Sequence, residues 1–290
     1  MLLEKIRIKD HYAIDYVLMR MSFDPLNMVN LEERVVKLPY RNEKINKVVT
    51  VQISKEDGEL IFTIEADVEE DKEQIVAFVQ DIFQLQEDLE KVQLHFAQTN
   101  LTTLFKQYPF TPVVKEVGLY PCLIKTIIHQ QLNLTFSHIL TERFVHTYGK
   151  QIDGVWFYPT PEDVAVLSYE DLRALQFSSR KAEYIIDTSR AIAEGELDLN
   201  QLKEESDEAI IRELITYRGI GKWTAQNWLL FGLGRKNLFP MADIGIQNAL
   251  KKYLQLEKKP TIEQMVTFSK DWEPYLTYAT MTLWRSIETS

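Results

Sequence analysis

Short apolar runs near the beginning of the chain predict β-strands. Four runs are β-branched or otherwise hydrophobic and are bounded by polar residues: 16–21, 34–38, 47–53 and 60–64. The last two runs flank a tetrapeptide that ends in Asp57 and Gly58. An Asp-Gly pair between two such runs is typical of a β-hairpin turn. We therefore predict an antiparallel sheet within the first 70 residues.

From residue 69 onward, hydrophobic residues recur at the spacing of helices. Between residues 69 and 84 the apolar positions form one helical face opposite acidic residues: Ile75, Phe78, Val79 and Ile82. From about residue 101 to residue 287, helical segments follow one another, and several begin with a capping residue such as Thr160, Ser206 or Thr261. The pattern predicts an α+β domain over residues 1–100, in which a helix covers the sheet, and an all-helical domain over residues 101–290.

One stretch of the helical part has an unusual organisation. A helical run from Glu208 to Tyr217 ends at Gly219-Ile220-Gly221, a tight turn that glycine enters at low cost. A second helix begins near Thr224. A linker then leads to Asp243, which stands at the N-cap position of a third helix. The stretch therefore predicts two helices joined by a glycine hairpin, with a carboxylate at the start of the next helix.

The hairpin has the features of an anion site. Backbone N–H groups between Gly219 and Thr224 are free at a helix start, where they attract anions. Gly219 and Gly221 lack the Cβ atoms that would keep a phosphate away, and Arg218 and Lys222 add positive charge. Such a site binds the nucleic-acid backbone without recognising sequence. An ordinary interhelical turn is the alternative, because Gly-Ile-Gly matches neither the dinucleotide fingerprint nor the P-loop.

Several motifs occur together in the helical part. Residues 214–225 are L-I-T-Y-R-G-I-G-K-W-T-A, F-P-x-x-D follows at 239–243, and residues 127–131 are I-I-H-Q-Q. With further matches between residues 157 and 197, this combination resembles the helix-hairpin-helix DNA glycosylase superfamily, in particular its alkylbase branch, which includes 3-methyladenine DNA glycosylase II. The resemblance implies a helix-hairpin-helix glycosylase domain, preceded by an N-terminal domain like the predicted one.

The resemblance implies that Asp243 is catalytic. A carboxylate beside the sugar stabilises the cationic transition state of N-glycosidic bond cleavage and orients or deprotonates the attacking water. Without the resemblance, a plain helix N-cap is the alternative. Bifunctional members use a lysine two residues after the second glycine of the hairpin, where this chain has Trp223. The difference favours water as the nucleophile and argues against strand-cleaving lyase activity.

Aromatic residues are the candidates for a pocket that receives the flipped base. Trp223 and Trp284 match family positions that line this pocket, and Tyr278 is a further candidate. Electron-rich ring faces attract N3- or N7-alkylated purines, which carry a positive charge. Packing in the core is the alternative role of each ring. Asn227 replaces a position that is often aromatic in this branch, which leaves the range of damaged bases open.

Gln131 aligns with the wedge residue that fills the space left by the flipped base. Family wedges are often apolar, so a glutamine on a helix surface is the alternative. His129 replaces the usual glycine of the segment, and Arg218 replaces the usual proline of the hairpin. None of the five histidines has the spacing of a metal site. As in relatives, a monovalent or divalent cation can bridge hairpin carbonyls and a phosphate; we expect no other cofactor.

The charge is unusual for a DNA-binding protein, at −10 overall. Residues 1–100 contain 12 Lys and Arg against 20 Asp and Glu, a net −8, whereas residues 206–260 contain 9 against 5, a net +4. The hairpin region is therefore basic, and the overall charge argues against a large DNA footprint rather than a small one. The single cysteine, Cys122, excludes an internal disulfide and the four-cysteine cluster of some superfamily members.

These observations predict a monofunctional DNA glycosylase of base excision repair. It would flip alkylated purines such as 3-methyladenine and 7-methylguanine out of damaged double-stranded DNA and remove them by hydrolysis. No run approaches the ~18 apolar residues of a membrane span, and no signal-peptide pattern begins the chain, so we expect a cytoplasmic protein. A monomer is the default expectation. The alternatives are a glycosylase for another lesion such as oxidised guanine, a non-catalytic DNA module that senses lesions, and an interaction protein built on the same bundle.

Overall fold

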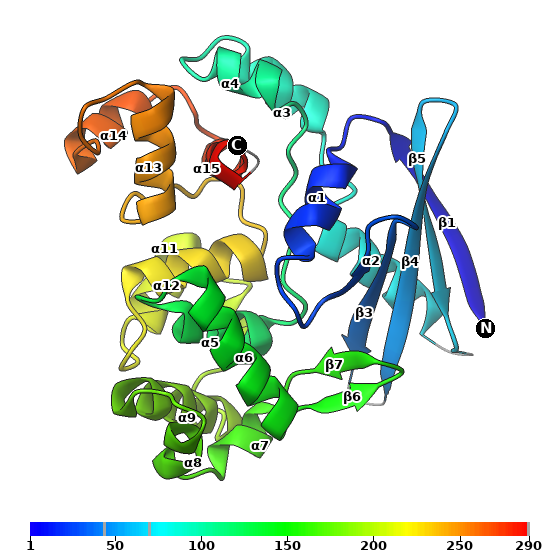
Figure 1. Cartoon of the computed structure of the whole chain (residues 1–290), viewed down its shortest axis with the longest axis vertical. Coiled ribbons are helices and arrows are strands. Elements are labelled where there is room, and N and C mark those ends of the chain that lie inside the picture. Colours follow the sequence, from blue (N-terminus) through cyan, green and yellow to red (C-terminus); the bar gives the residue numbers. More distant parts are fainter. Residues whose placement is uncertain (43–44, 69–70, 289–290) are drawn as a thin grey trace.

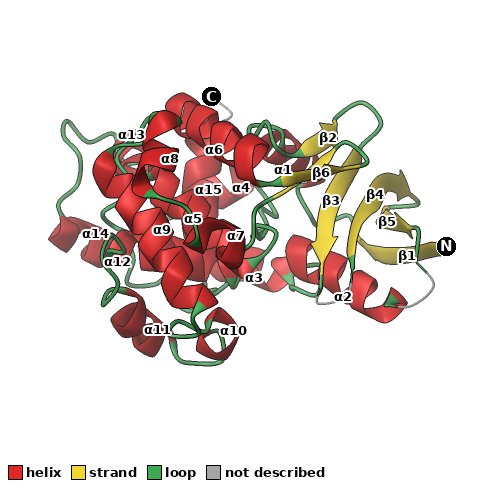
Figure 2. Ribbon diagram, turned by 90° about the horizontal axis from the view of Figure 1, so that it is seen from below, coloured by secondary structure: helices red, strands yellow, loops and turns green. Residues whose placement is uncertain are grey.

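The computed structural model describes residues 1–42, 45–68 and 71–288. Figure 1 shows a β-sheet on one side of the molecule, formed by the first part of the chain, and helices on the other side. Figure 2 shows the same separation from below, with most strands at one end. The predicted fold class is confirmed. In these described ranges, no helix is both long and apolar enough to cross a membrane.

The sheet has five antiparallel strands in the order β1-β5-β4-β3-β2. Its strands are β1 (Leu2–Lys9), β2 (Met28–Asn30), β3 (Val35–Arg41), β4 (Asn46–Glu56) and β5 (Glu59–Ala66). The predicted hairpin joins β4 to β5, which pair up to Glu56 opposite Glu59. Asp57 and Gly58 both have a positive φ, 48° and 81°, as a tight turn of this kind requires.

The first predicted strand is wrong, because residues 16–21 belong to helix α1 (Ile14–Met21). Ile14, Val17 and Leu18 are buried and lie at helical spacing. A short apolar run is compatible with a buried helix or a strand, and here tertiary packing favours the helix. Strands β1 and β2 were not predicted, since β1 alternates polar and apolar residues only in its second half and β2 has three residues.

Helix α2 (Lys72–Phe83) covers the sheet, as predicted. The ring of Phe83 lies 5.4 Å from that of Phe62 on β5, and the ring of Phe78 lies 5.2 Å from that of Tyr40 on β3. Figure 1 shows α2 passing behind the strands. The predicted helix starts at residue 69, but residues 69 and 70 lie outside the described part of the chain.

Most of the remaining chain is helical. The elements before the glycine hairpin are α3 (Leu89–Phe96), α4 (Thr102–Gln107), α5 (Leu119–His129), α6 (Leu134–Tyr148), the paired strands β6 (Lys150–Ile152) and β7 (Val155–Phe157), α7 (Pro161–Ala165), α8 (Tyr169–Ala174), α9 (Ser179–Ala193), α10 (Leu199–Leu202) and α11 (Asp207–Leu214). Two predicted caps are confirmed. Thr160 forms a capping box with Asp163, and the Ser206 side chain accepts a hydrogen bond from the N–H of Ala209.

The elements after the hairpin build the last third of the molecule. They are α12 (Lys222–Asn227), the π-helical turn η1 (Trp228–Gly232), α13 (Ile244–Tyr253), α14 (Ile262–Phe268) and α15 (Leu276–Glu288). Thr261 caps α14 through a capping box with Gln264, as its position predicts. The single cysteine, Cys122, is buried in α5, and burial raises the pKa of its thiol.

The last helix connects the sheet-bearing part to the helical part. The hydroxyl of Tyr16 on α1 donates to Oε2 of Glu288 at 2.7 Å. On the other side, α15 packs against α13 and α4. The rings of Phe96 and Phe105 stack across residue 100 with their centroids 3.9 Å apart. Helices α3 and α4 therefore pack together across residue 100. The division of the chain into two domains at this residue stays a prediction.

Candidate active site

The glycine hairpin lies between α11 and α12. Ile220 is 4% exposed and anchors the turn in the core, while its N–H donates to the carbonyl of Tyr217 at 3.0 Å. Gly221 is the N-cap of α12. No side chain in the described chain caps this helix, so the N–H groups of its first turn remain available to a ligand.

The two glycines of the hairpin are required for different reasons. Gly219 has a φ of 92°, and a Cβ there would lie 2.1 Å from the ring of Tyr184 on α9. Gly221 has a φ of −98°, and a Cβ there would meet no atom within 4 Å. The space freed at Gly219 is therefore taken by Tyr184. Open space for a phosphate lies at Gly221.

The side chains predicted to bind phosphate differ in their availability. Nη2 of Arg218 lies 2.6 Å from Oε2 of Glu183, so this arginine already has an acidic partner. Lys222 is exposed. Thr224 is 1% exposed, and its hydroxyl accepts a hydrogen bond from Nε2 of Gln130 at 2.7 Å. Thr224 can therefore reach an anion only through its backbone N–H.

The end of α5 is fixed against the hairpin. Nε2 of Gln130 also donates to the carbonyl of Gly219 at 2.8 Å. Nζ of Lys181 donates to three carbonyl oxygens between residues 127 and 130, at 2.7 to 2.9 Å. Gln131 follows with a φ of 56° and is exposed. It thus lies just beyond the helix rather than on its surface, on a segment held from two sides.

Asp243 is the N-cap of α13, as predicted, and also contacts two tryptophans. Its Oδ1 accepts a hydrogen bond from the N–H of Ile246 at 3.0 Å. Nε1 of Trp223 donates to Oδ2 at 3.2 Å, and Nε1 of Trp284 donates to Oδ1 at 3.1 Å. Three donors thus fix the orientation of the carboxylate. Since a carboxylate has about four acceptor positions, it can still accept a hydrogen bond from water.

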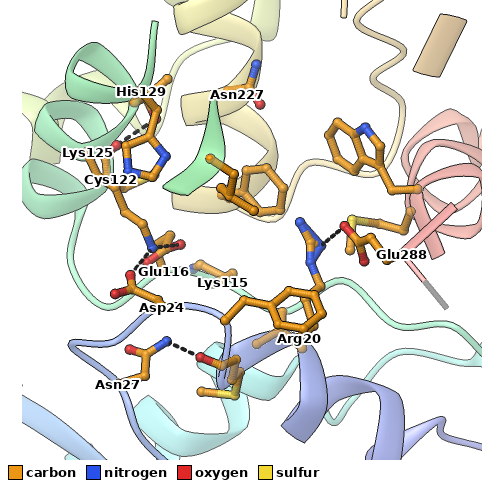
Figure 3. Close-up of a pocket in the computed structure, with 18 of the residues that line it drawn as sticks. Arg20, Asp24, Asn27, Lys115, Glu116, Cys122, Lys125, His129, Asn227 and Glu288 are labelled. Atoms are coloured by element: carbon orange, nitrogen blue, oxygen red, sulfur yellow. Dashed lines mark hydrogen bonds and ion pairs between the residues drawn. The ribbon is translucent and has the colours of Figure 1, made fainter. Parts of the chain in front are cut away.

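A cavity of about 380 Å³ lies beside Asp243. Trp223, Trp284 and Phe231 form an aromatic wall, and the rings of the last two stack with centroids 5.7 Å apart and planes 16° apart. Figure 3 draws 18 of the residues that line this space. Tyr278 lies apart from the described lining. It is 1% exposed and donates to Oε2 of Glu87 at 3.4 Å, so it has the position of a core residue.

The other end of the cavity is polar, and its residues were not predicted. Nζ of Lys125 lies 2.6 Å from Oδ2 of Asp24 and 2.6 Å from Oε1 of Glu116 (Figure 3). Burial opposes both charged forms, but the opposite charges outweigh it, raising the pKa of Lys125 and lowering that of Asp24. Asp24 and Lys125 therefore stay ionised near pH 7. We call Asp24, Glu116 and Lys125 the acidic–basic cluster.

Two residues that depart from the family pattern also line the cavity. Nδ2 of Asn227 donates to the carbonyl of Trp223 at 2.8 Å, and Asn227 is 5% exposed. Nε2 of His129 lies 3.1 Å from the hydroxyl of Thr141. Burial, followed by the positive charge of Lys125, lowers the pKa of His129 to about 3, so its ring is neutral near pH 7. Within the described residues, no three His, Cys, Asp or Glu side chains are grouped to hold a metal ion.

The partly buried His129 should make the protein sensitive to acid. Its pKa is about 3 in the folded chain and about 6.5 in the unfolded chain, so between these values the unfolded chain binds the extra proton. Stability is therefore lost as the pH falls below 6.5, by about 2 kcal/mol at pH 5. Urea unfolding at pH 7 and at pH 5 measures the loss of unfolding free energy in each protein. This loss should be about 2 kcal/mol smaller in His129→Gln than in the wild-type protein. An equal loss in both proteins would contradict a His129 ring that stays neutral in the folded chain.

Comparison with known proteins places this site in a family. The family model described as "HhH-GPD superfamily base excision DNA repair protein" matches residues 124–274, more than half of the chain. The chain belongs to the HhH-GPD superfamily. The match includes the hairpin and Asp243, and it ends before Trp284.

Relatives of this HhH-GPD protein indicate its branch. A Bacillus subtilis protein provisionally named DNA-3-methyladenine glycosylase YfjP is 51% identical over 286 residues, which cover 98% of this chain and 99% of the relative. The solved structure of the 3-methyladenine DNA-glycosylase from Archaeoglobus fulgidus has a TM-score of 0.82 at 22% identity, with 98% of both chains covered. The protein therefore belongs to the DNA-3-methyladenine glycosylase family of base excision repair.

The same fold also occurs in glycosylases with another named substrate. The Clostridium acetobutylicum 8-oxoguanine glycosylase/lyase, solved in complex with double-stranded DNA, has a TM-score of 0.72 at 16% identity and covers 100% of this chain and 98% of its own. This likeness concerns the fold alone. The substrate of this HhH-GPD protein therefore has to be argued from its own cavity.

Proposed function

We propose that this glycosylase hydrolyses the N-glycosidic bond of alkylated purines, such as 3-methyladenine and 7-methylguanine, in double-stranded DNA. The observation that carries the proposal is the contact of the Asp243 carboxylate with the indoles of Trp223 and Trp284 at 3.2 and 3.1 Å. A base flipped into the cavity stacks against the aromatic wall while its sugar stays near Asp243. The positive charge of an alkylated purine favours these ring faces.

The chemistry follows from the charge of the base. When the bond between the base and C1′ breaks, the base keeps the bonding electron pair and leaves as a neutral molecule, so it needs no general acid. Positive charge develops on the sugar, and the carboxylate of Asp243 stabilises it. Water adds to C1′ and loses a proton, for which Asp243 is the base. The product is an abasic site in an unbroken strand.

The hairpin and the end of α5 supply the contacts with DNA. A phosphate binds at the N–H groups that follow Gly221, beside the exposed Lys222. Arg218 joins it by exchanging Glu183 for the phosphate. Gln131, exposed just beyond the fixed end of α5, acts as the wedge. These few contacts agree with a small basic footprint on an acidic protein, and their affinity should fall steeply with salt.

Alanine substitutions at the two glycines should separate folding from DNA binding. In Gly219→Ala the methyl group meets Tyr184 and the φ of 92° is strained, so we expect a loss of about 2–3 kcal/mol of stability. Gly221→Ala should lose no more than about 1 kcal/mol, because alanine is a poorer N-cap than glycine, and should weaken binding to duplex DNA severalfold. Urea unfolding and fluorescence-anisotropy titration measure the two effects. Wild-type DNA affinity in Gly221→Ala would rule out a phosphate at this glycine.

Lyase activity is not part of the proposal. Trp223 occupies the position at which bifunctional relatives have their lysine. Two lysines line the cavity in the described part of the chain. Lys125 is held protonated by Asp24 and Glu116, and a protonated amine is not a nucleophile. Nζ of Lys115 is paired with Oδ2 of Asp81 at 2.6 Å. We therefore favour alkylated purines over oxidised guanine. Oxidised guanine is supported only by the similar fold of the 8-oxoguanine glycosylase/lyase. The cytoplasmic location and the monomeric state remain predictions.

The proposal is tested by incubating the protein with methylated duplex DNA. Chromatography of the supernatant should show free 3-methyladenine and 7-methylguanine. Denaturing gels should show strands that break only after alkali treatment, as unnicked abasic DNA does. Strand cleavage without alkali, or a borohydride-trapped adduct between protein and DNA, would contradict the hydrolytic mechanism.

A further inference from the structure

Arg20, on helix α1, brings a positive charge from the sheet-bearing part of the molecule into the cavity. Its Cζ lies 5.3 Å from the centroid of the Phe231 ring and 5.6 Å from that of Trp284. Figure 3 shows the guanidinium pointing toward Glu288. Arg20 therefore lies against the aromatic wall on which a flipped base would stack.

The hydrogen-bonding capacity of Arg20 is only partly used. Its Nη1 is buried and makes no hydrogen bond within the described chain. Oε1 of Glu288 is 3.9 Å away, which is too far for a hydrogen bond, and Oε2 of Glu288 is held by the hydroxyl of Tyr16 at 2.7 Å. Lys125 differs, because both of its carboxylate partners lie at 2.6 Å. A buried donor without an acceptor costs free energy, which an acceptor on a ligand would recover.

We propose that Arg20 selects 6-oxopurines among the alkylated bases by donating a hydrogen bond from Nη1 to O6. The inference rests on the proposed function, since it concerns the base that enters the same cavity. Guanine-type bases carry the acceptor O6 where adenine-type bases carry an amino group, which is itself a donor. Arg20 therefore favours 7-methylguanine over 3-methyladenine. Both bases are positively charged, so repulsion by the guanidinium largely cancels in this comparison.

The two bases can be compared in one reaction, because methylated duplex DNA contains both. In Arg20→Met the aliphatic stem is kept and the donors are lost. We expect the single-turnover rate of 7-methylguanine release to fall about tenfold, while the rate for 3-methyladenine changes less than about twofold. Arg20→Lys keeps the charge but loses the planar fork, and it should also lower the ratio of the two rates. The matched control is Arg7→Met, on strand β1 and outside the cavity lining, which should keep the wild-type ratio.

The ratio also separates this inference from folding defects and from the proposed function. A variant that is partly unfolded lowers both rates together and leaves their ratio unchanged. If properly folded Arg20→Met lowers both rates equally, Arg20 binds a phosphate or supports the cavity, and the selection of 6-oxopurines is wrong. If Arg20→Met leaves both rates unchanged, the selection of 6-oxopurines by Arg20 is also wrong. If the wild-type protein releases neither base, the proposed function itself fails.

Discussion

Replacing Asp243 by Asn should reduce base release about 10³-fold while leaving the fold intact. The amide oxygen of Asn can still cap α13 by accepting the N–H of Ile246, so helix and loop keep their positions. The negative charge that stabilises the sugar cation is lost. The amide NH2 would also face the N–H of Trp223, which donates to Oδ2 in the wild-type protein. Single-turnover release of 7-methylguanine from a methylated duplex measures the effect.

The control for this variant is Asp271→Asn. Asp271 follows α14, outside the described cavity lining, and should give the wild-type rate. Thermal unfolding and DNA affinity of Asp243→Asn should both stay close to the wild-type values. Base release by Asp243→Asn at a rate near that of the wild-type protein would leave Asp243 with the role of a helix cap only.

Lys125→Met should have the largest effect on stability, a loss of about 3–5 kcal/mol. The side chains of Lys125 and Asp24 are only 14% and 10% exposed. Removing the ammonium group leaves the buried carboxylate of Asp24 and the partly exposed carboxylate of Glu116 without their shared cation. An uncompensated buried charge, here that of Asp24, is costly. Urea unfolding at pH 7, compared with the wild-type protein, measures the loss.

Two further variants test whether charge causes this loss. Lys115→Met removes a neighbouring lysine whose partner, Asp81, is 56% exposed, so it should cost less than about 1 kcal/mol. In the double variant Lys125→Met with Asp24→Asn, one of the stranded charges is removed, and part of the stability should return. If Lys115→Met and Lys125→Met lose equal stability, the acidic–basic cluster does not depend on its buried charges.

Local signals explain which parts of the structure could be predicted. The caps at Thr160, Ser206 and Thr261, the Asp-Gly turn and the N-cap role of Asp243 each depend on residues within a few positions, and all are present. The resemblance to the helix-hairpin-helix glycosylases predicted that residues distant along the chain belong to one site. Of these residues, Trp223 and Trp284 both donate a hydrogen bond to Asp243. Neither the spacing of these residues nor the composition of the chain predicts this contact.

The parts that could not be predicted depend on tertiary contacts. Arg20, Asp24 and Lys125 meet in the cavity only because α1 packs against the helical part, and the apolar run that forms α1 is equally compatible with a strand. Tyr278 lies in the core because its side chain points to Glu87 rather than to the cavity, and sequence spacing cannot distinguish the two directions. The buried hydroxyl of Thr224 is likewise a consequence of its contact with Gln130.

The most direct test of the central claim is a comparison of lesions under identical conditions. Duplexes that contain 7-methylguanine, 8-oxoguanine or no damage are incubated with excess protein, and the released bases and strand breaks are measured. The cavity beside Asp243 predicts release of 7-methylguanine with an unbroken abasic strand and no release from the other two duplexes. Release of 8-oxoguanine with strand cleavage, and none of 7-methylguanine, would contradict the account.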